Sequence, residues 1–311
     1  MVNIYLLLLA GLLLLFISGK YLVDSSVVIS KLLRIPRMII GLTVVAFGTS
    51  APELLVSIQA ALAGYSEIAI GNVVGSNISN ILLVLAITAL IFPIPVPATS
   101  VKQDWPMMMF VSILLYIFTL NGWLTRTEGI IFIGLLAGYL AFSVVKARRV
   151  NHTQERKETE ASMKWWVAGI IFLISCAGLA FGADLLVSNV AIIAEEFGIS
   201  QRVISVTMVA VGTSIPELAT SVIAALKKET DISVGNIIGS NIMNILSVLG
   251  VTTLIRPIKV NAEISRFDIP WMLGISLLLL LLMLPASRSR ITRWEGSFMI
   301  MIYLLYIYFI F

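Results

Sequence analysis

Long apolar stretches separated by short polar segments run along the whole chain, and this alternation predicts ten membrane spans. Their approximate limits are 3–31, 38–63, 68–92, 104–120, 128–147, 164–195, 202–226, 232–255, 268–285 and 293–311. A helix that crosses the hydrocarbon core needs about 20 apolar residues, and each stretch meets or approaches that length. The pattern therefore predicts an all-α membrane protein surrounded by the lipid bilayer.

The composition agrees with a membrane protein and narrows its chemistry. Of the 311 residues, 59% are hydrophobic and 12% are charged, whereas a soluble domain carries roughly 25% charged residues. The single cysteine, Cys176, excludes an internal disulfide and a cysteine metal cluster. The formal net charge of +4 is best understood from the distribution of the basic residues along the loops. We expect no nucleic-acid partner.

The same pair of polar motifs occurs twice in this apolar sequence. Residues 43–57 read TVVAFGTSAPELLVS and residues 207–221 read TMVAVGTSIPELATS. Residues 71–82 read GNVVGSNISNIL and residues 235–246 read GNIIGSNIMNIL, so both motifs recur at an offset of 164 residues. Duplicated polar motifs in a hydrophobic chain are typical of a transporter built from two repeats around a shared site.

The span count gives the two repeats opposite orientations. Five spans precede the polar segment 148–163, the longest in the chain, and five follow it. Because five is odd, consecutive repeats start from opposite sides of the membrane. We therefore predict a first five-helix repeat at 1–147, a linker at 148–163 and a second, inverted five-helix repeat at 164–311.

The basic residues orient the chain across the membrane. Loops on one side, including the 148–163 linker, carry most of the lysines and arginines. The opposite loops hold only Arg126, Arg202, Arg256, Lys259 and Arg266. The positive-inside rule places the basic loops in the cytoplasm. We therefore predict a plasma-membrane protein with both termini outside and the linker cytoplasmic.

Two prolines lie in the middle of predicted spans. A proline removes a backbone donor and clashes with the carbonyl one turn earlier, so Pro52 and Pro216 predict interruptions of spans 2 and 7. Carbonyl groups freed there, near Ala46 and Ala210, are candidate cation ligands. Because the second motif places polar residues inside spans 3 and 8, we predict that helices 2, 3, 7 and 8 are all discontinuous.

Each interruption is followed directly by a glutamate. Glu53 and Glu217 fall in the first turn of the new half-helix, where the helix dipole favours an ionised carboxylate. The alternative is a capping box, because Ser50 and Ser214 precede the glutamates at the required spacing. An acid buried in a membrane costs several kcal/mol and is by default functional. Equivalent positions in both repeats favour a binding site.

The second motif supplies further candidate ligands. Ser76 and Asn80 are four residues apart and share a helix face, as do Ser240 and Asn244. The remaining amides of the motif are equally suited to interhelical hydrogen bonds and to ion contact; they are Asn72, Asn77, Asn236 and Asn241.

These residues define an all-oxygen site with two acids. It contains carboxylates, hydroxyls, amide oxygens and backbone carbonyls, but no thiolate and no histidine. Oxygen ligands suit hard cations. Two carboxylates balance the charge of one Ca²⁺, and Na⁺ accepts the same ligands. The absence of basic residues from the motifs argues against an anionic substrate.

The duplicated GTSxPE and GNxxGSNxxN motifs resemble the repeats of the Ca²⁺:cation antiporter superfamily, and within it the prokaryotic Na⁺/Ca²⁺ exchangers. The resemblance covers essentially the whole chain. It implies a secondary active antiporter. We separately expect no enzymatic activity and no cofactor, and we expect the protein to function as a monomer. Na⁺ influx would drive electrogenic Ca²⁺ extrusion by alternating access. The implied ligands are Glu53, Glu217, Thr49, Thr213, Ser50, Ser214, Ser76, Ser240, Asn80 and Asn244, with carbonyls of Ala46 and Ala210.

Three positions bear on the coupling ion. Some relatives, including K⁺-dependent exchangers, carry an aspartate where this chain has Asn244, so the resemblance implies K⁺-independent transport. H⁺-coupled relatives carry an acid where this chain has Gly75 and Gly239, which disfavours proton coupling without excluding it. A Ca²⁺/H⁺ antiporter or another cation/Ca²⁺ exchanger remains the main alternative.

A selective cation channel is the third possibility, because it could use the same oxygen ligands. Half-helices in an inverted repeat favour alternating access instead. Flux that depends on a counter-ion on the opposite side separates the two mechanisms.

Overall fold

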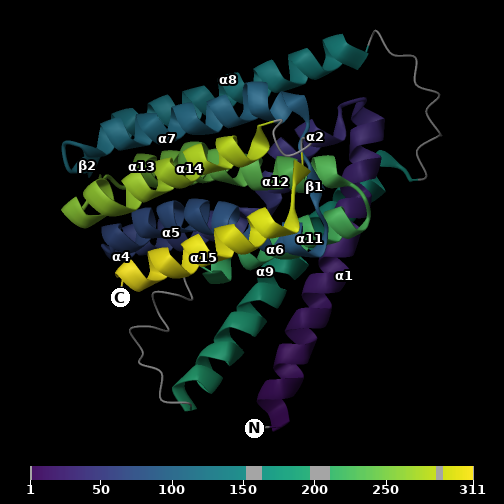
Figure 1. The fold of residues 1–311 in the computed structure, drawn as a ribbon, viewed down its shortest axis with the longest axis horizontal. Coiled ribbons are helices and arrows are strands. Elements are labelled where there is room, and N and C mark those ends of the chain that lie inside the picture. The colour runs from purple at the N-terminus through teal and green to yellow at the C-terminus, as the bar shows by residue number, and fades with distance from the viewer. Residues whose placement is uncertain (1, 152–162, 197–210, 285–289, 311) are drawn as a thin grey trace.

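The computed structural model describes residues 2–151, 163–196, 211–284 and 290–310, which are almost entirely helical. Figure 1 shows a bundle of helices that lie roughly alongside one another. Two long helices, α1 (Val2–Leu33) and α9 (Trp165–Glu196), cross one end of this bundle and project beyond it.

The first half of the chain contains short helices joined by π-helical turns, which are labelled η. After α1 it comprises α2 (Arg37–Ile40), η1 (Gly41–Val45), α3 (Ala46–Thr49), α4 (Ala51–Ala63), α5 (Ser66–Ser79), η2 (Asn80–Leu85), α6 (Ala86–Ile91), β1 (Ile94–Pro95), η3 (Ser100–Asp104), α7 (Trp105–Thr119), β2 (Trp123–Leu124) and α8 (Arg126–Asn151).

The second half repeats this order. After α9 the described elements are α11 (Ile215–Leu226), α12 (Thr230–Met243), η4 (Asn244–Leu249), α13 (Gly250–Ile255), β3 (Ile258–Lys259), η5 (Ile264–Asp268), α14 (Ile269–Met283), β4 (Arg290–Ile291) and α15 (Arg293–Ile310).

The helix that carries the first glutamate is broken where the sequence predicts it. Segments Arg37–Thr49 and Ala51–Ala63 meet at Ser50 with a bend of 43°. Proline occupies the start of α4, where a missing N–H removes no helical hydrogen bond. Ser214 has nearly the same backbone angles as Ser50 at the start of α11. Residues 197–210, which include most of the first half of predicted span 7, lie outside the described part of the chain.

The prediction of discontinuous helices 3 and 8 is wrong. Ser66–Ile91 and Thr230–Ile255 are continuous helices, each widened by one π-helical turn that begins at Asn80 or Asn244. The second motif contains no proline, so every residue keeps its backbone N–H and the hydrogen-bond ladder shifts instead of breaking. Such π-helical turns occur frequently at functional sites.

Six helices in the described residues are long and apolar enough to cross a membrane, or seven if the bent pair at Ser50 counts as one span. They are Ile4–Leu33, Ser66–Ile91, Arg126–Val145, Trp165–Val190, Thr230–Ile255 and Ile264–Met283. The count of ten remains a prediction, since expected spans 4 and 10 are not among these helices and span 7 lies partly outside the described residues. The 148–163 linker also lies largely outside them.

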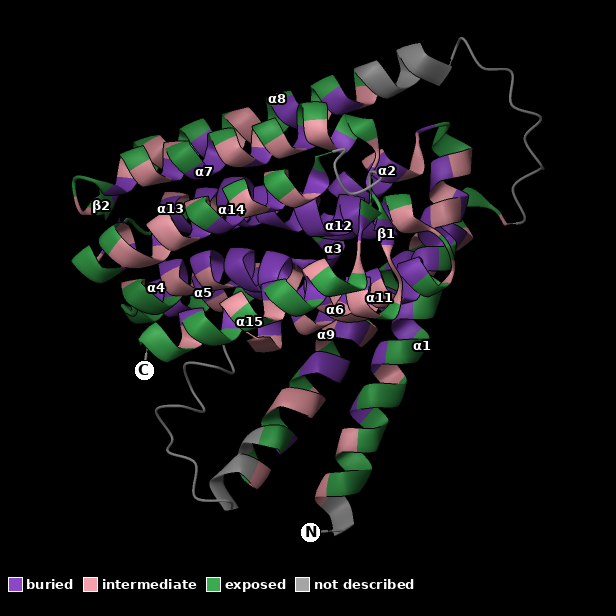
Figure 2. Ribbon diagram, in the orientation of Figure 1, coloured by how far each residue is buried: buried purple, intermediate pink, exposed green. Residues whose placement is uncertain are grey.

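The helices that carry the second motif form the core of the bundle (Figure 2). In an 18-residue window of the span Thr230–Ile255, 89% of the residues are buried, whereas in Trp165–Val190 at the periphery the share is 28%. Helix α12 approaches the first half closely: a Cβ atom at Gly235 would lie 2.6 Å from the Met38 carbonyl oxygen, and one at Gly239 the same distance from that of Leu42. Glycine therefore allows the two motif-bearing segments to pack backbone to backbone.

Equivalent contacts join the two halves in both directions. Strand β1 pairs with β4, and β2 pairs with β3. Arg126 donates to the carbonyl of Ile255 (3.5 Å), and Arg293 donates to that of Ile91 (3.4 Å). Ile255 and Ile91 are 164 positions apart, so an arginine of each half bonds to an equivalent carbonyl of the other half.

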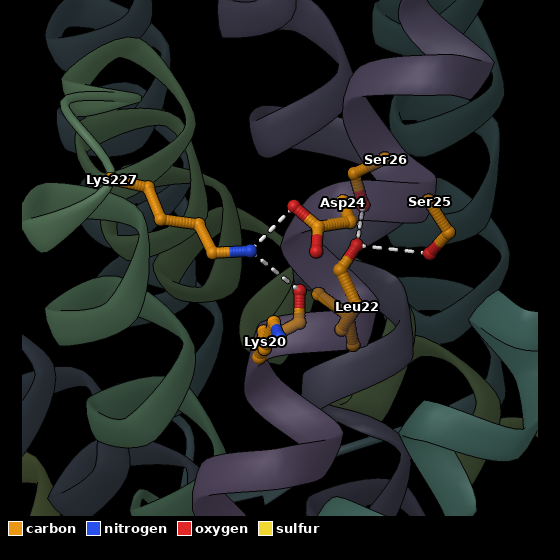
Figure 3. Close-up of polar contacts among 6 residues, drawn as sticks. All are labelled: Lys20, Leu22, Asp24, Ser25, Ser26 and Lys227. Atoms are coloured by element: carbon orange, nitrogen blue, oxygen red, sulfur yellow. Dashed lines mark hydrogen bonds and ion pairs between the residues drawn. The ribbon is translucent and has the colours of Figure 1, made fainter. Parts of the chain in front are cut away.

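Helix α1 packs mainly on α9 and is tied to the core near its C-terminal end. Lys227, which follows α11, forms an ion pair with Asp24 and donates to the Lys20 carbonyl oxygen (3.2 Å; Figure 3). The hydroxyls of Ser25 and Ser26 both donate to the carbonyl of Leu22 (3.0 and 2.7 Å). Ser25 and Ser26 therefore bond within the helix, and Lys227 provides a polar link between α1 and the core.

Candidate ion-binding site

Two glutamates lie at the centre of the bundle, each in the first turn of a helix. Glu53 is on α4 and Glu217 is on α11, and both are completely inaccessible to solvent. The other predicted ligands are also buried: Ala46, Thr49, Ser50, Ser76, Asn80, Thr213, Ser214, Ser240 and Asn244. Ala210 lies outside the described residues. The two motifs of each half, although about 25 residues apart in sequence, thus bury their polar residues in the same core.

Hydrogen bonds bring these residues together across the two halves. Ser50 donates to Oε1 of Glu217 (3.1 Å), which also accepts a bond from Ser240 (3.3 Å). The hydroxyls of Ser76 and Thr213 are 3.1 Å apart. Polar side chains from α4, α5, α11 and α12 therefore surround one region between the halves.

Several oxygens in this region have no hydrogen-bond partner within the described structure. They are Oε1 and Oε2 of Glu53, Oε2 of Glu217, and Oδ1 of Asn80 and Asn244. A buried polar group without a partner costs about 1–3 kcal/mol, and a charged one costs more. A cation bound among these atoms would remove that cost, so they are the natural ligands of the site.

The capping alternative is not what the structure contains. Neither Ser50 nor Ser214 makes a side-chain capping bond to its helix. A capping box occurs instead at the start of α8, where Glu128 accepts bonds from the backbone N–H (2.9 Å) and hydroxyl of Thr125. Ser50 instead donates to Glu217 of the other half.

Asn72 and Asn236, two of the four amides whose role the sequence left open, form an outer layer of hydrogen bonds around the site. Asn72 donates to Ser57 (3.0 Å) and accepts from Thr213 (3.2 Å). Asn236 makes the equivalent bonds to Ser221 (3.0 Å) and from Thr49 (3.1 Å). Interhelical hydrogen bonding is thus the role of both amides in this structure.

Ser57 and Ser221 belong to this layer, although the sequence analysis did not select them. Both are fully buried, and each lies four positions after a site glutamate. Their recurrence at the offset of 164 residues is the signal that could have identified them.

The carbonyl of Ala46 is engaged in this conformation. It accepts the backbone N–H of Ser50 (3.0 Å) and the hydroxyl of Thr49 (3.3 Å). A carbonyl oxygen has two lone pairs. The Thr49 hydroxyl has a single proton and also lies 3.1 Å from Oδ1 of Asn236, so donation to Asn236 leaves one lone pair of the Ala46 carbonyl for a cation.

Among the described residues, the acids placed at the site are Glu53 and Glu217. No group of three or more His, Cys, Asp or Glu side chains suited to a metal occurs among the described residues. The ligand chemistry is two carboxylates among neutral hydroxyl and amide oxygens, which suits hard cations rather than transition metals.

Comparisons of the sequence and of the structure with known proteins point to the same family. The family model described as "Sodium/calcium exchanger protein" matches residues 3–145 and 167–311. The chain is 41% identical to CaxA of Alkalimonas amylolytica, covering 97% of each protein. It is 35% identical to the sodium/calcium exchanger MaX1 of Methanosarcina acetivorans, again covering 97% of each. A structure of the sodium-calcium exchanger NCX_Mj soaked with Na⁺ and Sr²⁺ is 32% identical, with a TM-score of 0.83 over 99% of this chain and 98% of that one.

Proposed function

Since the chain belongs to the sodium/calcium exchanger family, whose members are membrane antiporters, we propose that it exchanges Na⁺ for Ca²⁺ by alternating access at the buried two-glutamate site. The observation that carries the proposal is the set of unpartnered carboxylate and amide oxygens between the two halves. Two carboxylates neutralise one Ca²⁺, and Na⁺ uses the same oxygen ligands.

The proposed ligands come from equivalent positions of both halves. They are Glu53, Glu217, Thr49, Thr213, Ser50, Ser214, Ser76, Ser240, Asn80 and Asn244, with the carbonyls of Ala46 and Ala210. Reciprocal contacts such as β1 with β4 and β2 with β3 support a pair of inverted repeats at 1–147 and 164–311. A site between such repeats can be opened to either side by moving one set of helices against the other.

The amide at position 244 supports Na⁺ as the sole coupling cation. Asn244 gives the site two acids, so a Ca²⁺-loaded site is neutral and needs no K⁺ for charge balance. Gly75 and Gly239 provide no acid for a proton-coupled cycle. If more than two Na⁺ replace each Ca²⁺, every cycle moves net charge. We further propose a plasma-membrane monomer with both termini outside.

Uptake of ⁴⁵Ca²⁺ into proteoliposomes preloaded with Na⁺, K⁺ or protons tests this function. We expect accumulation with the outward Na⁺ gradient alone and no requirement for K⁺. Vesicles that contain the Glu53→Gln, Glu217→Gln double variant are the matched control for leakage. Uptake driven by protons and indifferent to Na⁺ would establish a Ca²⁺/H⁺ antiporter instead. Uptake that follows the Ca²⁺ gradient and needs no counter-ion would establish a channel.

A further inference from the structure

We propose that Asn77 and Asn241 are positioning residues that hold the ligand amides of Asn244 and Asn80 with oxygen, rather than nitrogen, facing the ion. The inference rests on the proposed function, because it concerns how the same site selects a cation. A side-chain amide has an acceptor end and a donor end of nearly equal size. Only the oxygen end binds a cation, so the direction of each amide must be fixed.

The four amides form two reciprocal pairs across the halves. Nδ2 of Asn80 donates to Oδ1 of Asn241 (3.1 Å), and Nδ2 of Asn244 donates to Oδ1 of Asn77 (3.2 Å). All four residues are at most 2% exposed, so water does not compete for these bonds. Each ligand amide therefore receives its direction from an amide of the other half.

Groups that can only accept hydrogen bonds fix the direction of the positioning amides. Nδ2 of Asn77 faces the backbone carbonyl of Asn241 (3.3 Å) and Sδ of Met272 (3.6 Å). Nδ2 of Asn241 faces Sδ of Met108 (3.5 Å). A carbonyl oxygen and a thioether sulfur carry no proton. Reversing either amide would place its oxygen against these acceptors.

The direction of the two positioning amides determines which end of each ligand amide faces the ion. Because Asn77 and Asn241 present oxygen to their partners, Asn244 and Asn80 must turn their nitrogens away from the site. Their Oδ1 atoms are then left buried and without a hydrogen-bond partner in the described structure. Met108 and Met272 are 164 positions apart, so both halves use the same chain of contacts.

A carboxylate needs no such control, and this difference provides the test. Both carboxylate oxygens are acceptors, so an aspartate at position 244 presents oxygen in either direction. We would measure equilibrium ⁴⁵Ca²⁺ binding to purified protein in Na⁺-free buffer. Asn77→Leu should weaken binding about tenfold in the wild-type background, and less than about twofold in the Asn244→Asp background.

The other half provides the matched control. Asn241 acts through Asn80, so Asn241→Leu should keep its full effect of about tenfold in the Asn244→Asp background. Equal losses for Asn77→Leu in both backgrounds would show a general packing role and overturn the proposal. A wild-type protein that does not bind Ca²⁺ would overturn the proposed function itself, whereas wild-type binding without this coupling overturns only the positioning role.

Volume-conserving variants cover the case in which Asn77→Leu does not fold. Met108→Leu removes the acceptor that faces Asn241, whereas Met272→Leu leaves Asn77 bonded to a backbone carbonyl. Methionine-to-leucine changes in a core are well tolerated. We expect Met108→Leu to weaken Ca²⁺ binding more than Met272→Leu. Equal effects of the two substitutions would contradict the proposal.

Discussion

The hydroxyl of Ser50 donates a hydrogen bond to Oε1 of Glu217, 3.1 Å away in the other half of the chain. In contrast, neither carboxylate oxygen of Glu53 has a hydrogen-bond partner in the described structure. Two glutamates at equivalent positions therefore have different surroundings. An unpaired buried carboxylate is more costly than one held by hydroxyl donors, so Glu53 gains more from a bound cation.

Each glutamate should be required for Ca²⁺ exchange. We expect Glu53→Gln and Glu217→Gln to reduce exchange by at least about 100-fold, because removing one partner of a buried charge interaction costs about 3–5 kcal/mol. ⁴⁵Ca²⁺ uptake driven by Na⁺ measures the loss. Glu67→Gln, at an exposed position in the first turn of α5, is the matched control and should leave uptake unchanged. Near-normal flux in either folded site variant would refute the assignment of that glutamate.

Acidic pH should weaken Ca²⁺ binding. Ca²⁺ requires ionised carboxylates at Glu53 and Glu217, and a proton on either one removes half of the charge that neutralises the ion. Affinity should therefore fall as the pH is lowered and recover as it is raised. The inhibition should be competitive, so saturating Ca²⁺ should restore the maximal rate of uptake. A fall in maximal rate at unchanged KM would indicate a proton effect elsewhere in the protein.

The buried glutamates were predictable, whereas their inequality was not. A repeated acid in apolar sequence already predicts a functional site, and Glu53 and Glu217 do lie in the same core. The repeat cannot predict that Glu217 accepts bonds from Ser50 and Ser240 while Glu53 lacks partners, because equivalent motifs predict equivalent contacts. The difference arises from how the halves pack in one conformation.

The backbone of the second motif illustrates another limit. Polar residues within a span suggested a break, but the helix continues through a π-helical turn that begins at Asn80. That turn depends on how the hydrogen-bond ladder shifts in three dimensions, which residue type does not encode. The two-residue strands β1 and β4 were also missed, because strands of that length leave no periodic pattern.

Close packing of α12 makes Gly239 sensitive to substitution. A Cβ atom there would lie 2.6–2.8 Å from three backbone atoms of Leu42, which cannot move aside as a side chain can. We expect Gly239→Ala to destabilise the protein by about 1–3 kcal/mol. Thermal unfolding of detergent-purified protein measures this. Gly274→Ala is the control, since no atom lies within 4 Å of its Cβ position, and a similar loss in both variants would argue against backbone overlap as the cause.

The ion pair between Lys227 and Asp24 should contribute little to stability. Both side chains are partly exposed, at 28% and 51%, and such pairs are worth about 0–1 kcal/mol. We expect Lys227→Met to change the free energy of unfolding by less than about 1 kcal/mol. Because the variant lacks the ion pair, raising the salt concentration should change its free energy of unfolding little. A loss of several kcal/mol would show that this link anchors α1 to the core.

Counting site charges predicts which transport step senses the membrane potential. With two carboxylates, the Ca²⁺-loaded site is neutral, whereas a site loaded with more than two Na⁺ is positive. Exchange of ⁴⁵Ca²⁺ for unlabelled Ca²⁺ uses only the Ca²⁺-loaded form, so an imposed potential should leave its rate unchanged in the wild type. Asn244→Asp adds a negative charge to the site, so the Ca²⁺-loaded form becomes anionic and the same self-exchange should become voltage-dependent. Gln103→Glu adds a charge at an exposed position outside the site and should not have this effect. Wild-type self-exchange that responds strongly to the potential would mean that the Ca²⁺-loaded site carries net charge, which contradicts a neutral complex of one Ca²⁺ with Glu53 and Glu217.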